Sequence, residues 1–499
     1  MKLYFLGHSE LIIELKNNKN QSIRILNDVW LSNYAFGDFL QRNPLWKWNS
    51  NFLGRIDFIF LSHPHCDHFD PYSLYWIYKH QKPDIILPEN MYWAESLIKK
   101  YLNPVNIIII ENNKPIKLKN IEFTGITFFH NYETNEKDVM TLFISNDEEI
   151  VFLEEDCAIP EKKEYYEILY YQFSKKNYKN RIYICVRNEL EGFFLATDEG
   201  SNIKRKEKIS HYLQKRKKEI EWEYYKFYDY NLPNLYKLKN FIKIYTGQGM
   251  IYPIELNQEL LKISSPLSLK QIVQIENKIQ KKYKKNISVF FHEPGYVYGF
   301  KNGNLVKKEL FSEDYKYYEI DFQSLNFTKY IKDEPVFNQF RDIEKQRILI
   351  KKLLERLYVY LNSYPEVPII DLFKNQYCIE IRYGTKENYK TTYYYLHFLH
   401  YGFRETDKNI IKPWEIYWAN DLEDYYYGRL DQFSSILLDL TTFRSFYFWT
   451  MLGIPYLNND IVKNKLTFHF KRALENLSVD DYVLPVLKNK IKIKRLDFV

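Results

Sequence analysis

Three histidines and an aspartate fall within six positions of this chain. The segment LSHPHCDHFD, residues 61–70, contains His63, His65, Asp67 and His68. Imidazole nitrogens and carboxylate oxygens are preferred ligands of Zn²⁺ and of iron. Without an ion, several polar rings in one tight loop would each need another hydrogen-bond partner, which is costly. The crowding of these residues therefore predicts a metal site.

The spacing within this loop predicts two ions. His63 and His65 are two positions apart, so in an extended segment both side chains project to the same side and can bind one ion. Asp67 and His68 follow at a turn and point toward a second position. The apolar run FIFL, residues 58–61, reads as a buried strand that would hold the loop.

The pattern H-x-H-x-D-H after an apolar strand resembles the signature of the metallo-β-lactamase fold. Upstream, Gly7-His8-Ser9 lies between the strand-like runs LYFL and LIIEL, and IRILND ends at Asp28. These segments resemble the opening hairpin of that fold. The resemblance implies a four-layer αββα sandwich of class α/β, in which Asp28 supports the metal loop.

The same resemblance implies the remaining ligands. The strand-like segment ITFFH ends at His130, where the family has a further ligand. The segment EIVFLEEDC places Asp156 where the family has the carboxylate that bridges both ions, and Glu154 and Glu155 are close enough to compete for that role. The implied ligands are His63, His65, Asp67, His68, His130 and Asp156.

The last ligand of the family, a histidine near the end of the domain, has no clear counterpart in this sequence. The segment FIKIYTGQGM has Gln248 at the corresponding place, and glutamine is a poor ligand for these ions. His292 follows the strand-like run NISVFF and is a better candidate for an additional ligand than His211, which lies in a Lys-rich segment. A position filled by water, or left vacant, is an equal alternative.

A narrower resemblance points to the branch related to CMP-N-acetylneuraminate hydroxylase. The segment DVWLSNYAFGDFLQ is similar to its D-P-W-L-x-G-x-A-F region, and SVFFHEPGYVYGFKNG to a later segment. Val29 stands where proline is usual and Asn33 where glycine is usual. The hydroxylase carries a Rieske iron–sulfur module, and this chain has no pair of C-x-H and C-x-x-H motifs to hold one. An oxygenase built on this chain would therefore need an electron-donor protein.

Three functions are open on this evidence. Two divalent cations, zinc first and iron as the alternative, bridged by Asp156, would lower the pKa of bound water toward neutrality and supply a nucleophile. The first hypothesis is a metal-dependent hydrolase of a small-molecule ester, lactone, amide or phosphodiester, with Asp67 as the catalytic residue that orients the nucleophile and takes its proton. The second is a dinuclear iron oxygenase, because the ligands are nitrogen and oxygen only. The third is a non-catalytic binding protein with a degenerate metal site.

Hydrophobic runs divide the 499 residues into two predicted parts. Residues 1–310 alternate short strands and helices, as the metallo-β-lactamase fold requires, with a charged helical insertion near 203–227. Residues 311–499 read as an added mixed α+β domain. Its predicted elements are a long amphipathic helix at 340–364, strands at 378–384 and 391–403, and helices at 430–454 and 464–477. This domain is expected to cap the metal cleft, bind substrate or mediate formation of a homodimer.

Composition narrows the partners and the compartment. The 71 basic residues are nearly balanced by 64 acidic ones, and the net charge is +7, so nucleic acid is not an expected partner. The 4 cysteines form no C-x-x-C pair and no disulfide framework, which indicates a reducing compartment. The first apolar run is too short for a signal peptide, and no run is long enough to span a membrane. We therefore expect a cytoplasmic protein without membrane contact.

Overall fold

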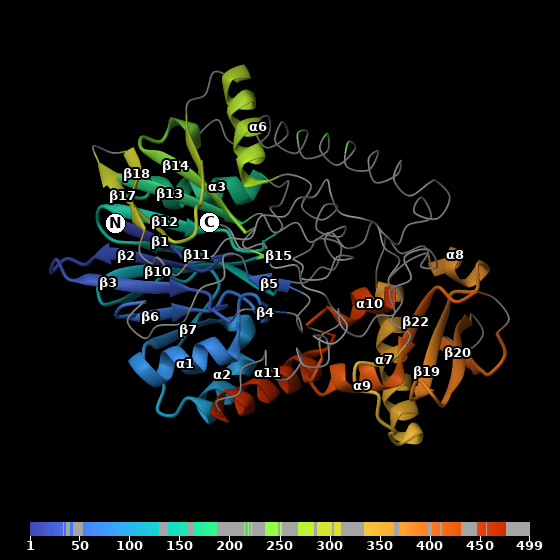
Figure 1. Cartoon of the computed structure of the whole chain (residues 1–499). Coiled ribbons are helices and arrows are strands. Elements are labelled where there is room, and N and C mark those ends of the chain that lie inside the picture. The colour runs from blue at the N-terminus through green and yellow to red at the C-terminus, as the bar shows by residue number, and fades with distance from the viewer. Residues whose placement is uncertain are drawn as a thin grey trace, which may run out of the picture.

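The computed structural model describes most of the chain (Figure 1). The described residues are 1–32, 34–35, 40–42, 53–128, 138–157, 163–186, 214, 218, 221, 235–247, 250–251, 268–283, 287–301, 304–310, 334–363, 369–397, 402–409, 412–430, 447–455 and 457–475. The insertion predicted near 203–227 lies almost wholly outside them.

Two mixed sheets stack face to face in the first part of the chain (Figure 1). The first sheet has the strand order β18 (Asn304–Leu310), β17 (Tyr296–Lys301), β1 (Lys2–Phe5), β2 (Leu11–Lys16), β3 (Ser22–Asn27), β6 (Phe58–Phe60), β7 (Asp84–Pro88) and β8 (Ile107–Ile110). The second has the order β16 (Ser288–Phe291), β14 (Phe241–Thr246), β13 (Asn180–Val186), β12 (Glu149–Leu153), β11 (Val139–Ser145), β10 (Ile121–Phe128) and β9 (Ile116–Leu118).

Each sheet buries both of its faces, which explains why its strands read as nearly continuous apolar runs. In β2, Leu11 and Ile13 point into the core between the sheets, while Ile12 packs on the opposite face. In β11, Leu142 points into the same core and Phe143 points away from it. The alternation follows from the two-residue period of a strand.

Helices cover the two outer faces and complete four layers (Figure 1). Helices α1 (Pro71–Gln81) and α2 (Tyr92–Tyr101) pack on the first sheet, and α3 (Lys163–Ser174) and α6 (Leu269–Lys282) pack on the second. Two short 3₁₀ helices, Glu89–Met91 and Leu235–Lys237, lie in connections. The predicted αββα sandwich is confirmed.

Strand direction brings several loops to one edge of the sandwich. β1, β3 and β6 run in the same direction, because β1 and β3 both pair antiparallel with β2 and β3 pairs parallel with β6. In the second sheet β10, β12, β13 and β14 likewise share one direction. A small sheet of β15 (Met250–Ile251), β5 (Leu40–Arg42) and β4 (Tyr34–Ala35) comes after the ends of β14 and β3. The loops that follow these strands can therefore meet.

The last part of the chain contains a separate mixed sheet with the order β21 (Gly402–Thr406), β20 (Tyr389–His397), β19 (Cys378–Gly384) and β22 (Glu415–Trp418). Its helices are α7 (Ile343–Ser363), α8 (Ile369–Lys374), α9 (Ala419–Tyr426), α10 (Tyr447–Leu452) and α11 (Asn459–Leu474). The long helix, the strand at 378–384 and the last helix were predicted correctly. The single strand predicted at 391–403 is wrong, because β20 ends at His397 and the chain reverses into antiparallel β21. Of the helix predicted at 430–454, residues 431–446 lie outside the described residues.

Helix α11 returns to the first part of the chain and packs against α1 and α2 (Figure 1). Leu466 and Phe470 are buried in the same cluster as the inner faces of those helices. The Phe470 ring stacks on Tyr101 with centroids 5.0 Å apart and meets Phe69, the residue after His68, edge to face at 6.4 Å. That a helix beyond residue 310 completes this layer could not be predicted from the apolar pattern of the helix alone.

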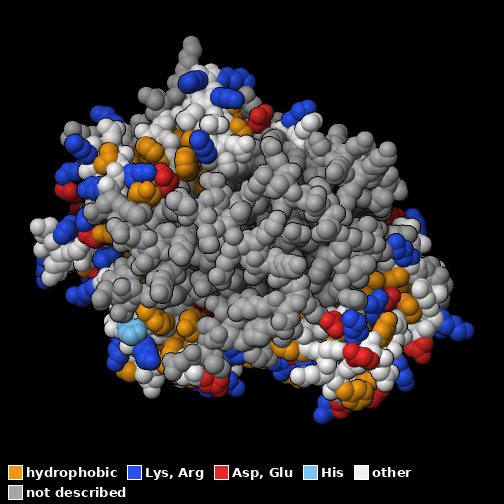
Figure 2. Space-filling view, viewed as in Figure 1, with side chains coloured by type: hydrophobic (Ala, Val, Ile, Leu, Met, Phe, Trp, Pro, Cys, Tyr) orange, Lys and Arg blue, Asp and Glu red, His pale blue; other side chains and the backbone are white. Residues whose placement is uncertain are grey.

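The described surface carries mixed charge. On the face shown in Figure 2, basic and acidic side chains are interspersed around the described elements. None of the described helices is long and apolar enough to cross a membrane.

Replacement of Phe470 by alanine is expected to lower the free energy of unfolding by about 3–5 kcal/mol, because a fully buried aromatic ring leaves a cavity. Urea denaturation of the whole protein measures the loss. The control is Leu474→Ala on the same helix, where the side chain is 47% exposed and little should change. Equal, small effects of both variants would contradict the packing of α11.

Glu415 connects β22 to α10 in the hydrophobic core of the last part of the chain. Its carboxylate accepts hydrogen bonds from the Tyr377 and Tyr417 hydroxyls and from the backbone N–H groups of Phe448 and Trp449. Burial raises the pKa of Glu415 to about 7, although these four bonds favour the charged form and lower it. The folded carboxyl therefore retains a proton in a pH range where an unfolded glutamate, with its ordinary pKa of 4.5, has lost it.

Stability is expected to fall as pH rises from about 4.5 to about 7, by up to about 3 kcal/mol from this group, because the unfolded chain binds fewer protons there. The variant Glu415→Gln lacks this titration. Between pH 4.5 and 7 the unfolding free energy of the wild type should therefore fall relative to that of the variant. Urea titrations at several pH values measure this change. The variant Glu405→Gln, on β21, serves as control, and a pH-independent difference for Glu415→Gln would refute the prediction.

Candidate metal centre

The loop between β6 and α1 carries the predicted ligands and is fixed at both ends. At its start, the Leu61 N–H donates to the Ile86 carbonyl of β7 at 3.1 Å. At its end, Asp70 caps α1 by accepting from the N–H groups of Tyr72 and Ser73, and Pro71 is the first helical residue. An aspartate cap followed by proline is a strong helix start, so the loop has a defined length and exit.

Residues after β3 clamp the same loop through the backbone. The Asp28 N–H donates to the Phe60 carbonyl at 2.8 Å, and the Val29 N–H to the His68 carbonyl at 2.8 Å. Asp28 has φ of 51°, a left-handed conformation that costs a non-glycine residue about 1–3 kcal/mol. This conformation turns the Asp28 side chain toward the loop.

The Asp28 carboxylate holds His68 and Ser62 in place. It accepts from the Ser62 N–H at 2.8 Å, from the Ser62 hydroxyl at 2.9 Å and from His68 Nδ1 at 2.6 Å. All three residues are buried. Because Nδ1 of His68 donates to Asp28, its Nε2 faces the interior of the site. A carboxylate behind a ligating histidine is the usual support of a metal site.

His63 and His65 present nitrogens to a common point. The Ser62 hydroxyl, which donates to Asp28, accepts from His63 Nδ1 at 2.9 Å, so Nε2 of His63 faces the interior of the site. That Nε2 lies 3.1 Å from Nδ1 of His65. Two nitrogens that bind one tetrahedral Zn²⁺ at about 2.0–2.1 Å lie roughly 3.3 Å apart. The observed spacing fits one shared cation.

Asp156, just after β12, connects this pair to His68. Its Oδ2 lies 3.1 Å from His68 Nε2 and 3.9 Å from His63 Nε2. His63, His65 and Asp156 form one group of ligand atoms that all lie within 4.8 Å of one another. A single carboxylate oxygen thus faces rings from both halves of the motif, as a bridge between two cations would.

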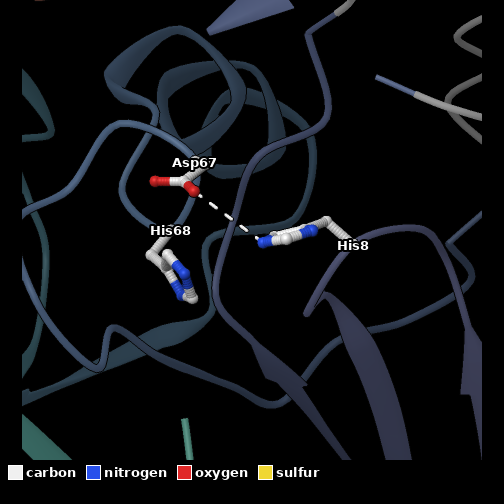
Figure 3. A group of neighbouring side chains, drawn as sticks. All are labelled: His8, Asp67 and His68. Carbon is white, nitrogen blue, oxygen red and sulfur yellow. Dashed lines mark ion pairs between the residues drawn. The ribbon is translucent and has the colours of Figure 1, made fainter. Parts of the chain in front are cut away.

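A second group of ligand atoms contains Asp67 and His68 together with His8 (Figure 3). His8 Nε2 lies 3.8 Å from Asp67 Oδ2, and all three side chains are buried. A third group combines Asp28, His68 and Glu155. The centre is therefore built from the ends of β1, β3, β6 and β12.

The carboxylates dominate the electrostatics of the centre. Burial acts to lower the pKa of His68, but the charges of Asp156, Asp28 and Asp67 outweigh it and hold that pKa well above the usual 6.5. Burial, together with the charge of Asp28, raises the pKa of Glu155 well above its ordinary value. The site thus favours positive charge at its centre, which is what bound cations would supply.

Two residues named from the sequence lie outside the described residues. His130 comes two positions after the last described residue of β10, and Gln248 follows Gly247. Their roles stay predictions.

His292 is described and lies among backbone groups. Its Nε2 is 2.8 Å from the Gly7 carbonyl and its Nδ1 is 3.2 Å from the Tyr245 carbonyl. Burial lowers its pKa to about 4, so the ring is neutral and has one N–H, which the shorter contact assigns to Gly7. The structure does not bring His292 into any of the three ligand groups among the described residues.

His8 is the residue of the centre that sequence reasoning missed. The sequence alone indicates it only as part of a Gly-His-Ser hairpin segment. The available signal was the direction of the strands, since β1 runs parallel to β3 and β6 and its end must meet theirs. The sequence indicates Glu155 only as a substitute for Asp156, whereas its φ of 55° turns it toward Asp28 and Asn27.

The two stacked mixed sheets, the helices on both outer faces and the histidine–aspartate loop after β6 define a protein of the metallo-β-lactamase fold. Comparison with solved structures finds proteins of this kind. No protein-family model matches the sequence, and no curated protein matches it.

Three of the similar structures illustrate the range. A possible metal-dependent hydrolase from Veillonella parvula shows 14% identity and a TM-score of 0.37 over 60% of this chain and 98% of that one. CmlA, a diiron β-hydroxylase from Streptomyces venezuelae, shows 11% identity and a TM-score of 0.34 over 62% of this chain and 54% of that one. The metallo-β-lactamase fold protein YhfI from Bacillus subtilis shows 11% identity and a TM-score of 0.30 over 60% and 99%.

Replacement of Asp28 by asparagine is expected to weaken binding of Zn²⁺ by about 10–100-fold, because His68 loses the carboxylate that orients it. Asparagine tolerates the left-handed backbone at this position, so the loop should keep its path. Calorimetric titration of Zn²⁺ into the metal-free protein measures the change.

The matched control is Asp57→Asn. Asp57 is a buried carboxylate at the opposite end of β6, where it accepts from the Arg24 N–H and from Lys119. This variant should lose stability but keep its metal affinity. Equal affinities of wild type and Asp28→Asn would show that Asp28 does not support the centre.

Proposed function

We propose that the protein is a metal-dependent hydrolase with a dinuclear centre that acts on a small-molecule ester, lactone, amide or phosphodiester. One observation carries the proposal. Asp156 Oδ2 lies 3.1 Å from His68 Nε2 and 3.9 Å from His63 Nε2, so one carboxylate oxygen faces rings from both halves of the motif. A carboxylate in this position can bind two cations at once, one beside His63 and His65 and one beside His68.

The donor set fits two divalent cations. One position would be bound by His63, His65 and Asp156, with His130 as a further candidate. The other would be bound by Asp67, His68 and Asp156. Zinc is the first choice for such nitrogen and oxygen ligands in a hydrolase, and iron is the alternative. Cations held there supply activation of water at neutral pH and polarisation of the bond under attack.

The chain itself would position and deprotonate the water. Asp67 is the proposed catalytic residue, because it lies on the rigid loop before His68 with its carboxylate inside the centre. A carboxylate within hydrogen-bond reach can orient water and take its proton. Asp28 and Ser62 would keep His68 and His63 in their ligating orientation throughout the reaction.

A dinuclear iron oxygenase is the second candidate. The group His63, His65 and Asp156 has two imidazoles and one carboxylate, which is the ligand pattern of many non-haem iron oxygenases. This alternative requires an electron-donor protein. Two bound irons with visible absorption and dioxygen uptake would favour it, whereas two zinc ions with hydrolysis would favour the first.

Replacement of His65 by alanine is expected to remove one of two bound ions and to reduce hydrolysis by at least about 100-fold, because the first position loses a ligand. Elemental analysis of protein loaded with Zn²⁺ gives the stoichiometry. Initial rates on aryl ester, lactone and phosphodiester substrates give the activity.

The control variant is His80→Ala, since His80 lies exposed on α1 and faces Trp76. It should keep both ions and full activity. A His65→Ala protein that retains two ions, or a wild-type protein that binds none, would refute the proposed centre.

A further inference from the structure

His8 lies at the inner end of a short loop between β1 and β2. β1 ends at Phe5, and the Leu6 N–H closes the turn by donating to the Glu10 carbonyl at 3.0 Å. The His8 side chain is fully buried, with its ring 5.9 Å from those of Trp30 and His68. A buried imidazole beside a second imidazole and a carboxylate has the chemistry of a ligand.

Two residues that follow strands of the second sheet donate hydrogen bonds to the backbone of this loop. The Gly247 N–H, after β14, donates to the His8 carbonyl at 3.0 Å. His292 Nε2, after β16, donates to the Gly7 carbonyl at 2.8 Å. Both bonds fix the backbone that carries His8 without using its ring. The position of the ring is therefore set by the fold and not by a mobile loop.

The ring is directed at the second half of the metal motif. His8 Nε2 lies 3.8 Å from Asp67 Oδ2, and Figure 3 shows His68 on the other side of the same space. Two atoms that share one ion at about 2.0–2.2 Å can lie no more than roughly 4.4 Å apart. The Asp67–His8 distance meets that limit. One ligand atom from each of His8, Asp67 and His68 lies within 4.8 Å of the others.

We propose that His8 is a protein ligand of the second cation, together with Asp67 and His68. The inference rests on the proposed dinuclear centre and names the ligand that the sequence left open. Two imidazoles and one carboxylate suit Zn²⁺ or Fe²⁺. His292 is not a ligand in this proposal; it positions the loop that carries His8.

The test compares metal content of whole proteins loaded with Zn²⁺ and passed through a desalting column. The wild type should retain two ions, His8→Ala one, and the control His80→Ala two. Circular dichroism of each protein checks that the fold is kept. Two ions in a folded His8→Ala protein would overturn the ligand role of His8 and leave the dinuclear centre standing. No ion in the wild type would overturn both.

A second variant keeps a donor at the position, because removal of a buried ring can disturb a loop. His8→Cys loaded with Co²⁺ should show a thiolate-to-cobalt charge-transfer absorption beyond that of the wild type, which contains Cys66 nearby. This signal arises only from direct ligation. Ser22→Cys, at the start of β3 and thus at the opposite end of that strand from Asp28, is the control and should not add the band. Absence of the added band in His8→Cys, with two ions bound, would count against the proposal.

Discussion

The whole centre depends on one buried carboxylate, Asp28. It lies at the end of β3 in a left-handed backbone conformation and receives His68, the Ser62 hydroxyl and the Ser62 N–H. Through Ser62 the same carboxylate also sets the orientation of His63. A single acid therefore decides which nitrogen each ring presents, and the two halves of the motif keep a fixed relation to each other.

This arrangement concentrates negative charge in a largely buried space. Asp28, Asp67, Asp156 and Glu155 lie close together and are largely buried. Carboxylates packed in this way repel one another and lose hydration, which is unfavourable unless positive charge is added. Protonation of Glu155 and of His68 reduces part of this repulsion. The strained backbone at Asp28 and Glu155 belongs to the same balance, since the packed sheets must hold conformations that the local sequence does not favour.

The sandwich could be predicted because short apolar runs alternate with helical stretches and because the histidine motif resembles that of a known fold. The sequence also named the loop of His63 and His68, since close spacing of ligands can be read directly from the chain. The place of His8 in the centre could not be predicted, because its partner Asp67 lies far along the sequence. Only the shared direction of β1 and β6 brings the two residues together. The reversal after His397 was not predicted, because the aromatic run continues through it without a turn signal. Long-range pairing decides both cases.

The position of helix α11 has a consequence for folding during synthesis. Its Phe470 ring lies against Phe69, directly after the metal loop, and against Tyr101 of α2. During synthesis from the ribosome, the layer that backs this loop stays incomplete until nearly five hundred residues have emerged. Closure of such a distant contact slows folding, because the chain must order a long intervening stretch first. The metal loop therefore gains its contact with Phe470 long after the residues that carry its ligands have emerged.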